Sequence, residues 1–244
     1  MPRQLPDAAL GPLAGPADSL ADQAVAAIRA AVRDGTLQPG QLYSAYQIAS
    51  YLGVSRSPVR EALMRLAEAG MVAFERNRGF RIVIPGAADI AEMFQLRLLL
   101  EVPAARRAAQ LAPPGLVADL ESELSRMRAA AAGHHEALLM SHDRRLHRLI
   151  LEAAGNARLT AVVDNLRDAT RTLGASTADR SRNLSDIAAE HVPIVAAIAA
   201  ADATAAAAAM AHHITHTGTL LVAQAGGQLS ADALWASAAP GPAS

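Results

Sequence analysis

Three segments in the second half of the sequence carry imidazole or carboxylate side chains where apolar residues are expected. All 8 histidines lie between residues 134 and 216. Asp143 and His147 are four residues apart, so on a helix their side chains point in the same direction. His191 lies among the apolar residues of a second segment, and His213 lies at the edge of the apolar face of a third. Burying four such groups is costly unless they pair with one another or bind a cation.

One carboxylate and three imidazoles form a ligand set that suits a divalent transition metal. Zinc is the first choice, and nickel, manganese and iron also accept these ligands. Taken singly, each histidine is more typical of a satisfied core or surface residue, and the coincidence of four favours a metal. His212 is the rival to His213, because the alanine-rich last segment defines its faces weakly.

A second group of candidate residues lies in GVSRSPVREAL at 53–63, which predicts a turn followed by a helix. Gly53 permits the tight turn, and Pro58 suits the first turn of a helix. Arg56 and Arg60 then face solvent one turn apart, where an arginine can contact a phosphate or grip a guanine. A solvated basic face is the alternative reading of the same spacing.

The segment after this helix carries further positive charge. MVAFERNRGFRIVIP at 71–85 alternates apolar and polar residues around Arg78 and Gly79, which predicts a two-stranded wing with a basic tip. Between residues 53 and 85, six arginines (56, 60, 65, 76, 78, 81) outnumber three glutamates (61, 68, 75), in a chain whose formal net charge is -1. Positive charge is thus concentrated at the motif, as binding to DNA phosphates requires.

The elements that must position these residues divide the chain into two domains. An amphipathic helix over 19–34, the helix-turn-helix and the wing predict a winged helix-turn-helix domain over 19–85. Residues 89–225 show helical periodicity without a strand signal, which predicts an all-α bundle and a mainly α fold class. Its six predicted helices span 89–111, 115–132, 135–154, 157–174, 183–200 and 202–224. Pro193 should kink the fifth helix or shorten its start.

Composition excludes several other classes of protein. The chain has no cysteine, which excludes disulfides and thiolate metal sites. It has no run of about 18 strongly apolar residues and no signal-peptide core, so we expect a cytoplasmic protein with no membrane partner. Aromatic residues make up only 3%, which argues against a stacking platform for single-stranded nucleic acid. Residues 1–18 and 226–244 are expected to form a flexible arm and tail.

The first domain resembles the N-terminal domain of the GntR family of bacterial transcription regulators. The resemblance rests on GTLQPG at 35–40, LGVSRSPVREALMRLAEAGMV at 52–72 and RGFRI at 78–82. It implies a homodimeric repressor or activator that binds a palindromic operator in double-stranded DNA. Family members often carry an arginine or glutamate pair before the first helix of the motif, where this chain has Tyr46. The residues expected to contact DNA are Ser55, Arg56, Ser57, Pro58, Arg60, Arg65, Arg78 and Gly79.

The second domain resembles the FCD domain, the FadR-like partner of the GntR motif. The matching stretches are DRRLHRLILEAAGN at 143–156, EHVPIVAAIAAAD at 190–202 and MAHHI at 210–214. The resemblance implies an all-helical bundle that binds small effectors, often organic acids, beside a metal. It assigns the metal-ligand positions to Asp143, His147, His191 and His213. A count of six helices rather than seven favours the VanR-like branch.

Arg97 and Glu101 share one face of the first bundle helix, which indicates an ion pair at a helix or domain interface. Alternatively, Arg97 binds a carboxylate of the effector. We expect a small carboxylate effector, because a divalent ion leaves positive charge in a largely apolar bundle.

Two alternatives to a metabolite-responsive regulator remain at this point: a metalloenzyme with an appended DNA-binding module, and a pure metal sensor. The sequence offers no general base beside the cluster, since Glu152 and Glu190 are expected to point away from the apolar stripes. We therefore expect a regulator rather than an enzyme.

Overall fold

The computed structural model describes residues 19–227 except 69, 84–85, 173–176 and 179–180. The predicted arm over 1–18 and nearly all of the predicted tail lie outside the described residues. The chain forms two compact units, the first built on residues up to 85 together with the segment 168–175, and the second on the other residues from 86 onward. The predicted mainly α class, with a small wing in one domain and a helical bundle in the other, is confirmed. None of the described helices is long and apolar enough to cross a membrane.

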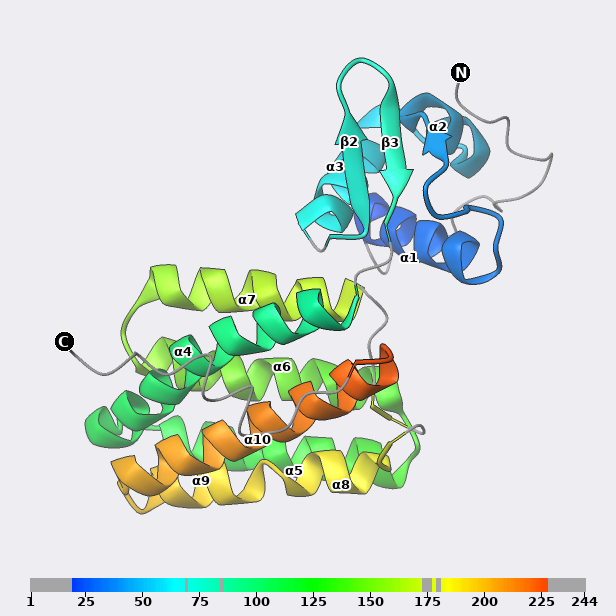
Figure 1. Ribbon diagram of the computed structural model, residues 1–244. Helices are drawn as coiled ribbons and strands as arrows, with labels where there is room; N and C mark the ends of the chain where they lie inside the picture. The colour runs from blue at the N-terminus through cyan, green and yellow to red at the C-terminus, as the bar shows by residue number, and fades with distance from the viewer. Residues whose placement is uncertain (1–18, 69, 84–85, 173–176, 179–180, 228–244) are drawn as a thin grey trace. The chain divides into compact units, whose positions relative to one another are not determined.

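The N-terminal unit contains three helices and a small antiparallel sheet (Figure 1). The helices are α1 (Leu20–Arg33), α2 (Ala45–Leu52) and α3 (Arg56–Glu68), and the strands are β1 (Leu42–Tyr43), β2 (Val72–Glu75) and β3 (Gly79–Ile82). The strand order is β1-β3-β2, so β3 lies between the other two. The sequence predicted only β2 and β3. β1 was missed because both of its residues are buried and two residues cannot show an alternating pattern.

Local signals fix the helices of this unit in place. Ser44 and Gln47 form a reciprocal capping box at the start of α2, and Gly53 ends that helix in the left-handed conformation with φ 66°. The rings of Tyr43 and Phe80 lie 6.0 Å apart in the buried core. The start of α3 is thereby held directly after the turn, as the motif predicted.

The second unit is a bundle of seven helices within the described residues (Figure 1). They are α4 (Ala87–Leu111), α5 (Leu116–Ala132), α6 (Glu136–Ala153), α7 (Ala157–Thr172), α8 (Leu184–Ala189), α9 (Val192–Ala199) and α10 (Ala203–Gln224). α4 packs along α10, α5 packs along α6, and α9 lies beside α10.

The single helix predicted over 183–200 is wrong, because the chain forms α8 and α9 there. Pro193 lies in the first turn of α9. Proline has no N–H to donate to the carbonyl of Ala189, and its ring would clash with that carbonyl in a continuous helix. The break places His191 at the joint between the two helices, where it is fully buried. The helix count of six, and the preference for a six-helix branch that rested on it, are corrected accordingly.

Small residues allow α4 and α10 to approach closely. A Cβ atom on Gly218 of α10 would lie 2.8 Å from the ring of Phe94 on α4. Phe94 is fully buried, and the guanidinium of Arg97 lies 4.7 Å from the centre of its ring. Close packing of the two helices therefore fixes the part of α4 that carries Phe94 and Arg97.

Candidate metal centre and nucleic-acid interface

The bundle brings together all four residues that the sequence singled out as metal ligands. Asp143 and His147 come from α6, His191 from the α8–α9 joint, and His213 from α10. All four are buried, and one ligand atom from each lies within 4.8 Å of the others. The Nε2 atom of His191 is 2.9 Å from Oδ1 of Asp143 and 3.3 Å from Nε2 of His147.

Each imidazole is oriented by an acceptor outside the cluster. The Nδ1 atoms donate hydrogen bonds from His147 to Oε2 of Glu101 (2.5 Å), from His191 to the Ile187 carbonyl (2.9 Å) and from His213 to Oε2 of Glu190 (3.1 Å). Because carbonyl and carboxylate oxygens can only accept, the Nδ1 atoms carry the protons. The Nε2 lone pairs are then left to bind a metal, and such outer hydrogen bonds fix the tautomer of a metal-binding histidine.

The donor set fits a cation on chemical grounds. With both Nδ1 atoms protonated, the neutral rings of His147 and His191 direct two lone pairs at each other over 3.3 Å. The Nε2 atom of His191 also faces a carboxylate oxygen of Asp143 at 2.9 Å. Acceptors that face one another repel unless a proton or a metal ion lies between them. A divalent ion bound by these atoms removes that repulsion.

Ion pairs surround the cluster on several sides. Three arginines pair with three carboxylates: Arg97 with Glu101 (Nε to Oε1, 2.7 Å), Arg167 with Asp143, and Arg182 with Glu190. Each arginine side chain in these pairs is at most 10% exposed. The formal charges of the six groups cancel, so the neutral imidazoles lie in a core without net charge.

Burial and neighbouring charges set the protonation of the cluster. Burial alone would raise the pKa of the Asp143 carboxyl, but the guanidinium of Arg167 holds that pKa well below its usual range. Burial, followed by the charge of Arg167, lowers the pKa of His147 to about 4. Burial and the neighbouring His191 also lower the pKa of His213. A charged Asp143 carboxylate and neutral His147 and His213 imidazoles at neutral pH are the states that a metal requires.

The structure resolves the choice between two adjacent histidines on α10. His213 is buried in the cluster, whereas His212 is exposed and its ring stacks on that of His216 at a centroid distance of 6.1 Å. The expectation that Glu190 points away from the cluster is wrong. Glu190 caps the C-terminus of α8, and from the break in the helix its carboxylate reaches His213.

Arg97, the predicted effector contact, is buried within the bundle and 5% exposed. Its Nε atom donates a hydrogen bond to Oε1 of Glu101, and Oε2 of Glu101 accepts a hydrogen bond from His147. Of the two alternatives, the structure therefore shows an ion pair inside the helical bundle. Sequence reasoning missed Arg167 and Arg182, because neither lies in a motif and both reach their partners only through packing.

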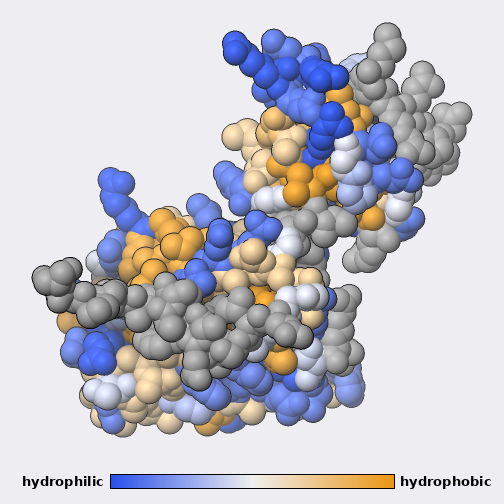
Figure 2. All heavy atoms as spheres, viewed as in Figure 1, coloured by the Kyte–Doolittle hydropathy of each residue, from blue (hydrophilic) through white to orange (hydrophobic). Residues whose placement is uncertain are grey.

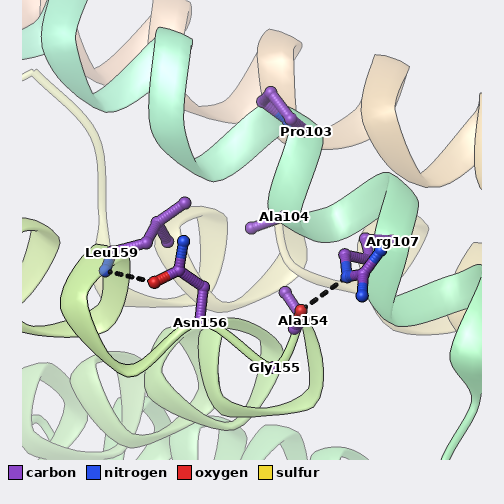
Figure 3. A pocket seen from close by; sticks show the side chains of 7 residues that line it. All are labelled: Pro103, Ala104, Arg107, Ala154, Gly155, Asn156 and Leu159. Atoms are coloured by element: carbon purple, nitrogen blue, oxygen red, sulfur yellow. Dashed lines mark hydrogen bonds between the residues drawn. The ribbon is translucent and has the colours of Figure 1, made fainter.

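A separate pocket opens on the surface of the bundle where α6 ends and α7 begins (Figure 3). It is lined by Pro103, Ala104, Arg107, Ala154, Gly155, Asn156 and Leu159. Two hydrogen bonds shape its wall: Arg107 donates to the Ala154 carbonyl (2.7 Å), and the side chain of Asn156 accepts from the Leu159 amide (3.1 Å). These bonds cap helix ends, and none of the four clustered residues lines this pocket.

The predicted DNA-contacting arginines fall into two groups. Arg56 and Arg60 at the start of α3 are exposed, as are Ser55 and Ser57, and neither arginine forms an ion pair with another described residue. Arg65 is different, because its guanidinium binds Asp22 of α1 (2.7 Å) and Glu61 of α3 (2.5 Å). Arg65 therefore ties α1 to α3 instead of presenting a free charge.

The wing presents one exposed arginine and one constrained glycine. The Arg78 side chain is 62% exposed and lies 3.4 Å from Glu75. Gly79 has φ 128°, and a Cβ atom there would lie 2.1 Å from the Tyr43 carbonyl oxygen of β1. The sheet itself thus requires glycine at this position.

Comparisons with known proteins agree with both units. Residues 20–82 match the gntR family of bacterial regulatory proteins, and residues 92–216 match the FCD domain. The chain is 30% identical over 183 residues to the probable D-xylose utilization operon transcriptional repressor of Paenarthrobacter nicotinovorans, covering 75% of this chain and 80% of that protein. It is 28% identical over 136 residues to the uncharacterized HTH-type transcriptional regulator YdhC of Bacillus subtilis, and this match spans 55% of this chain and 61% of YdhC.

Among solved structures, McbR/YncC of E. coli has a similar fold. The TM-score is 0.64 at 21% sequence identity, and the match covers 85% of this chain and 99% of the other. At this level of identity the likeness concerns the fold alone.

Proposed function

Because the chain belongs to the GntR family of bacterial transcription regulators and carries an FCD domain, it is a DNA-binding transcription regulator, and we propose that its bundle responds to a divalent metal together with a small organic acid. The relatives are transcription regulators, which confirms the expectation of a regulator rather than an enzyme. The observation that carries the proposal is the buried cluster of one aspartate and three oriented histidines.

In this proposal a dimer binds a palindromic operator through α3 and the wing. Arg56 and Arg60 support it, because they are exposed and free of ion pairs among the described residues, and Arg78 supplies charge at the wing tip. Arg56→Ala or Arg60→Ala should each weaken operator binding by about 1 to 3 kcal/mol. Arg128→Ala is the matched control, since Arg128 is an exposed arginine of the bundle. Unchanged affinity for both α3 variants in titrations at fixed salt concentration would refute these contacts.

Arg78→Ala distinguishes phosphate binding from base reading at the wing. If Arg78 contacts phosphate, affinity for operator and for random duplex should fall to a similar extent. A loss confined to one operator position would instead assign a base contact.

Arg65→Ala should lower the stability of the domain before it affects DNA binding, because Arg65 bridges α1 and α3.

Asp143, His147, His191 and His213 would hold the metal, with zinc the first choice. Purified wild-type protein, His191→Ala and His212→Ala should be reconstituted with zinc, dialysed and analysed for metal. We expect wild type and His212→Ala to retain zinc and His191→Ala to lose it. Equal zinc in all three proteins, or none in any of them, would exclude the site.

An organic-acid effector follows from the charge of the core. The three carboxylates are already neutralised by three arginines, so a divalent ion would add its full double positive charge to a buried site. Anionic oxygen ligands are the natural complement of such an ion. We expect a carboxylate to alter operator binding by metal-loaded protein and to have no effect after chelation. If metal alone changes operator affinity and no organic acid alters it further, the protein is a pure metal sensor.

A homodimer is supported by apolar side chains exposed on the bundle. Leu96 and Leu99 of α4 lie three residues apart and so share a face of the helix, and both are nearly half exposed, as is Val162 of α7. Figure 2 shows apolar side chains gathered on the visible face of this unit. We place a second copy of the chain on this α4 face. Sedimentation equilibrium should show a dimer for wild type and a shift toward monomer for Leu99→Glu. If Leu99→Glu remains as fully dimeric as wild type, this face of α4 is not the dimer interface.

A further inference from the structure

Two histidines outside the buried cluster share the exposed face of α10. His212 and His216 are four residues apart on this helix, so their side chains project in the same direction from consecutive turns. The side chain of His216 is 46% exposed, and His212 is exposed as well, in contrast to the buried His213 between them. The two rings stack, with 24° between their planes and 6.1 Å between their centroids. The helix therefore holds two imidazoles side by side at the surface.

The separation of the two rings suits a single metal ion. Zinc lies about 2.0 to 2.1 Å from an imidazole nitrogen, so two rings bound to one ion have centroids at most roughly 6.5 Å apart. The observed separation of 6.1 Å lies within that limit. A tetrahedral angle at the ion requires the centroids to be about 1 Å closer, which rotation of two exposed side chains supplies. Two histidines at this spacing on one helix face are the arrangement of helical zinc motifs.

Glu190 fixes the tautomer of one of the two rings. The Nδ1 atom of His216 donates a hydrogen bond to Oε1 of Glu190 (2.7 Å), and Arg182 pairs with the same carboxylate. Because a carboxylate oxygen only accepts, the proton of His216 is on Nδ1, and the Nε2 lone pair remains available. A carboxylate bonded to the other ring nitrogen is the usual outer partner of a metal-binding histidine. His212 forms no hydrogen bond with another described residue, so its ring is free to turn toward the same ion.

The donor set selects the kind of ion. Neither histidine belongs to the buried group of one aspartate and three histidines. Imidazole nitrogens suit copper, nickel and zinc, whereas magnesium and calcium require oxygen ligands. Only two protein ligands hold an ion here, and the exposed position leaves its remaining coordination to water. Such an ion exchanges readily with the solution.

We propose that His212 and His216 form a second metal site, which binds an exchangeable copper, nickel or zinc ion at the surface of α10. This site goes beyond the proposed function, because it shares no ligand with the buried cluster. An ion held by two exposed imidazoles is lost on dialysis against metal-free buffer, so zinc retained after such dialysis still reports on the buried cluster alone.

Counting bound ions at equilibrium tests the site. Full-length protein, first reconstituted with zinc and dialysed, is brought to equilibrium with buffers of increasing free nickel concentration, and total metal per chain is measured. Wild type should bind one more ion per chain than His212→Ala or His216→Ala. His134→Ala is the matched control and should behave as wild type, because exposed His134 lies before α6 and shares no helix face with its neighbour His135. Copper should bind more tightly than nickel, and excess magnesium should displace neither.

Moving the second imidazole along α10 tests whether both rings bind the same ion. Ala205 and Ala208 are both exposed on this helix. Combined with His216→Ala, the substitution Ala208→His restores a four-residue spacing to His212 and should restore the extra ion. Ala205→His places the new imidazole seven residues from His212, two turns away, and should not restore it.

Each result separates this site from the buried centre. If wild type and both single alanine variants bind equal numbers of ions at every nickel concentration, His212 and His216 do not form a metal site. If Ala205→His restores the extra ion as fully as Ala208→His does, each imidazole binds on its own, and the shared ion is wrong. If wild type binds the extra nickel but retains no zinc after dialysis, the surface site stands and the proposal of a buried metal fails.

Discussion

Replacing Glu101 by glutamine tests whether the buried ion pairs hold the metal centre in place. Glu101 is 1% exposed, accepts from Nε of Arg97 at 2.7 Å and accepts from Nδ1 of His147 at 2.5 Å. Burial would raise the pKa of the Glu101 carboxyl, but Arg97 and His147 hold it well below the usual range, so the pair is charged at neutral pH. Glutamine keeps the size of the side chain and removes its charge.

The expected cost follows from the burial of the partner. Removing one charge of a buried pair leaves the other uncompensated, which typically costs about 3 to 5 kcal/mol. Each kcal/mol shifts the melting temperature of a protein of this size by about 2 to 4 °C, so the melting temperature should fall by roughly 6 to 20 °C. Loss of the carboxylate that orients His147 should also weaken zinc binding by about 10- to 100-fold.

The chain supplies a matched control for this variant. Arg148 and Glu152 have the same four-residue spacing and nearly the same Nε to Oε1 distance, 2.8 Å, but their side chains are 47% and 43% exposed. Exposed pairs of this kind contribute little to stability, so Glu152→Gln should leave the melting curve unchanged. Thermal unfolding of metal-stripped proteins is followed by circular dichroism. Equal melting temperatures for the two variants would refute the claim that the Arg97–Glu101 pair stabilises the bundle.

Three further predictions concern packing and pH. Gly79→Ala should unfold the wing and abolish operator binding, because the added Cβ would lie 2.1 Å from the Tyr43 carbonyl oxygen. Gly40→Ala is the control and should weaken binding less, because Gly40 also has a positive φ but an added Cβ there would meet no atom within 4 Å. Equal losses of operator binding in the two variants would contradict this prediction. Gly218→Ala should lower the melting temperature by forcing Phe94 away from α10, and an unchanged curve would show that the helices separate freely. Metal-stripped protein should lose stability as the pH falls from 6.5 to about 4, because His147 binds a proton in the unfolded state but, with its lowered pKa, stays neutral in the folded state. The free energy of unfolding should fall by about 1.4 kcal/mol per pH unit over this range. Equal urea midpoints at pH 7 and pH 5 would refute this prediction.

The sequence predicted the parts of the site that depend on local periodicity. Asp143, His147 and His191 could be found because each lies within an apolar stripe or at its edge, and a polar residue at a core position needs a partner wherever the helix packs. The recognition helix was equally local, since its turn, proline and arginines are neighbours in the chain. The choice between His212 and His213 required the structure, because on an alanine-rich helix neither face is clearly apolar.

The rest of the centre depends on contacts between distant segments. Arg167 and Arg182 reach carboxylates on other elements, and no spacing in the sequence relates them. Glu190 was misjudged because a continuous helix would direct it outward, whereas the break before Pro193 turns it toward His213. β1 escaped notice for a similar reason, since two residues become a strand only when β3 pairs with them.

The charge balance of the core bears on what kind of metal site this is. In a structural metal site the ion compensates ligands that would otherwise be unpaired, so the protein unfolds without it. Here Asp143 is already paired with Arg167, and the imidazoles are neutral and held by Glu101 and Glu190. The charges of the core therefore balance before any ion arrives, and the hydrogen bonds that remain unmade are those of the facing Nε2 atoms and of a few buried arginine donors, so that metal-free and metal-bound forms can both be folded. Two folded states that differ in ligand are the condition for a ligand to shift an equilibrium, and a regulator of DNA binding requires such a shift.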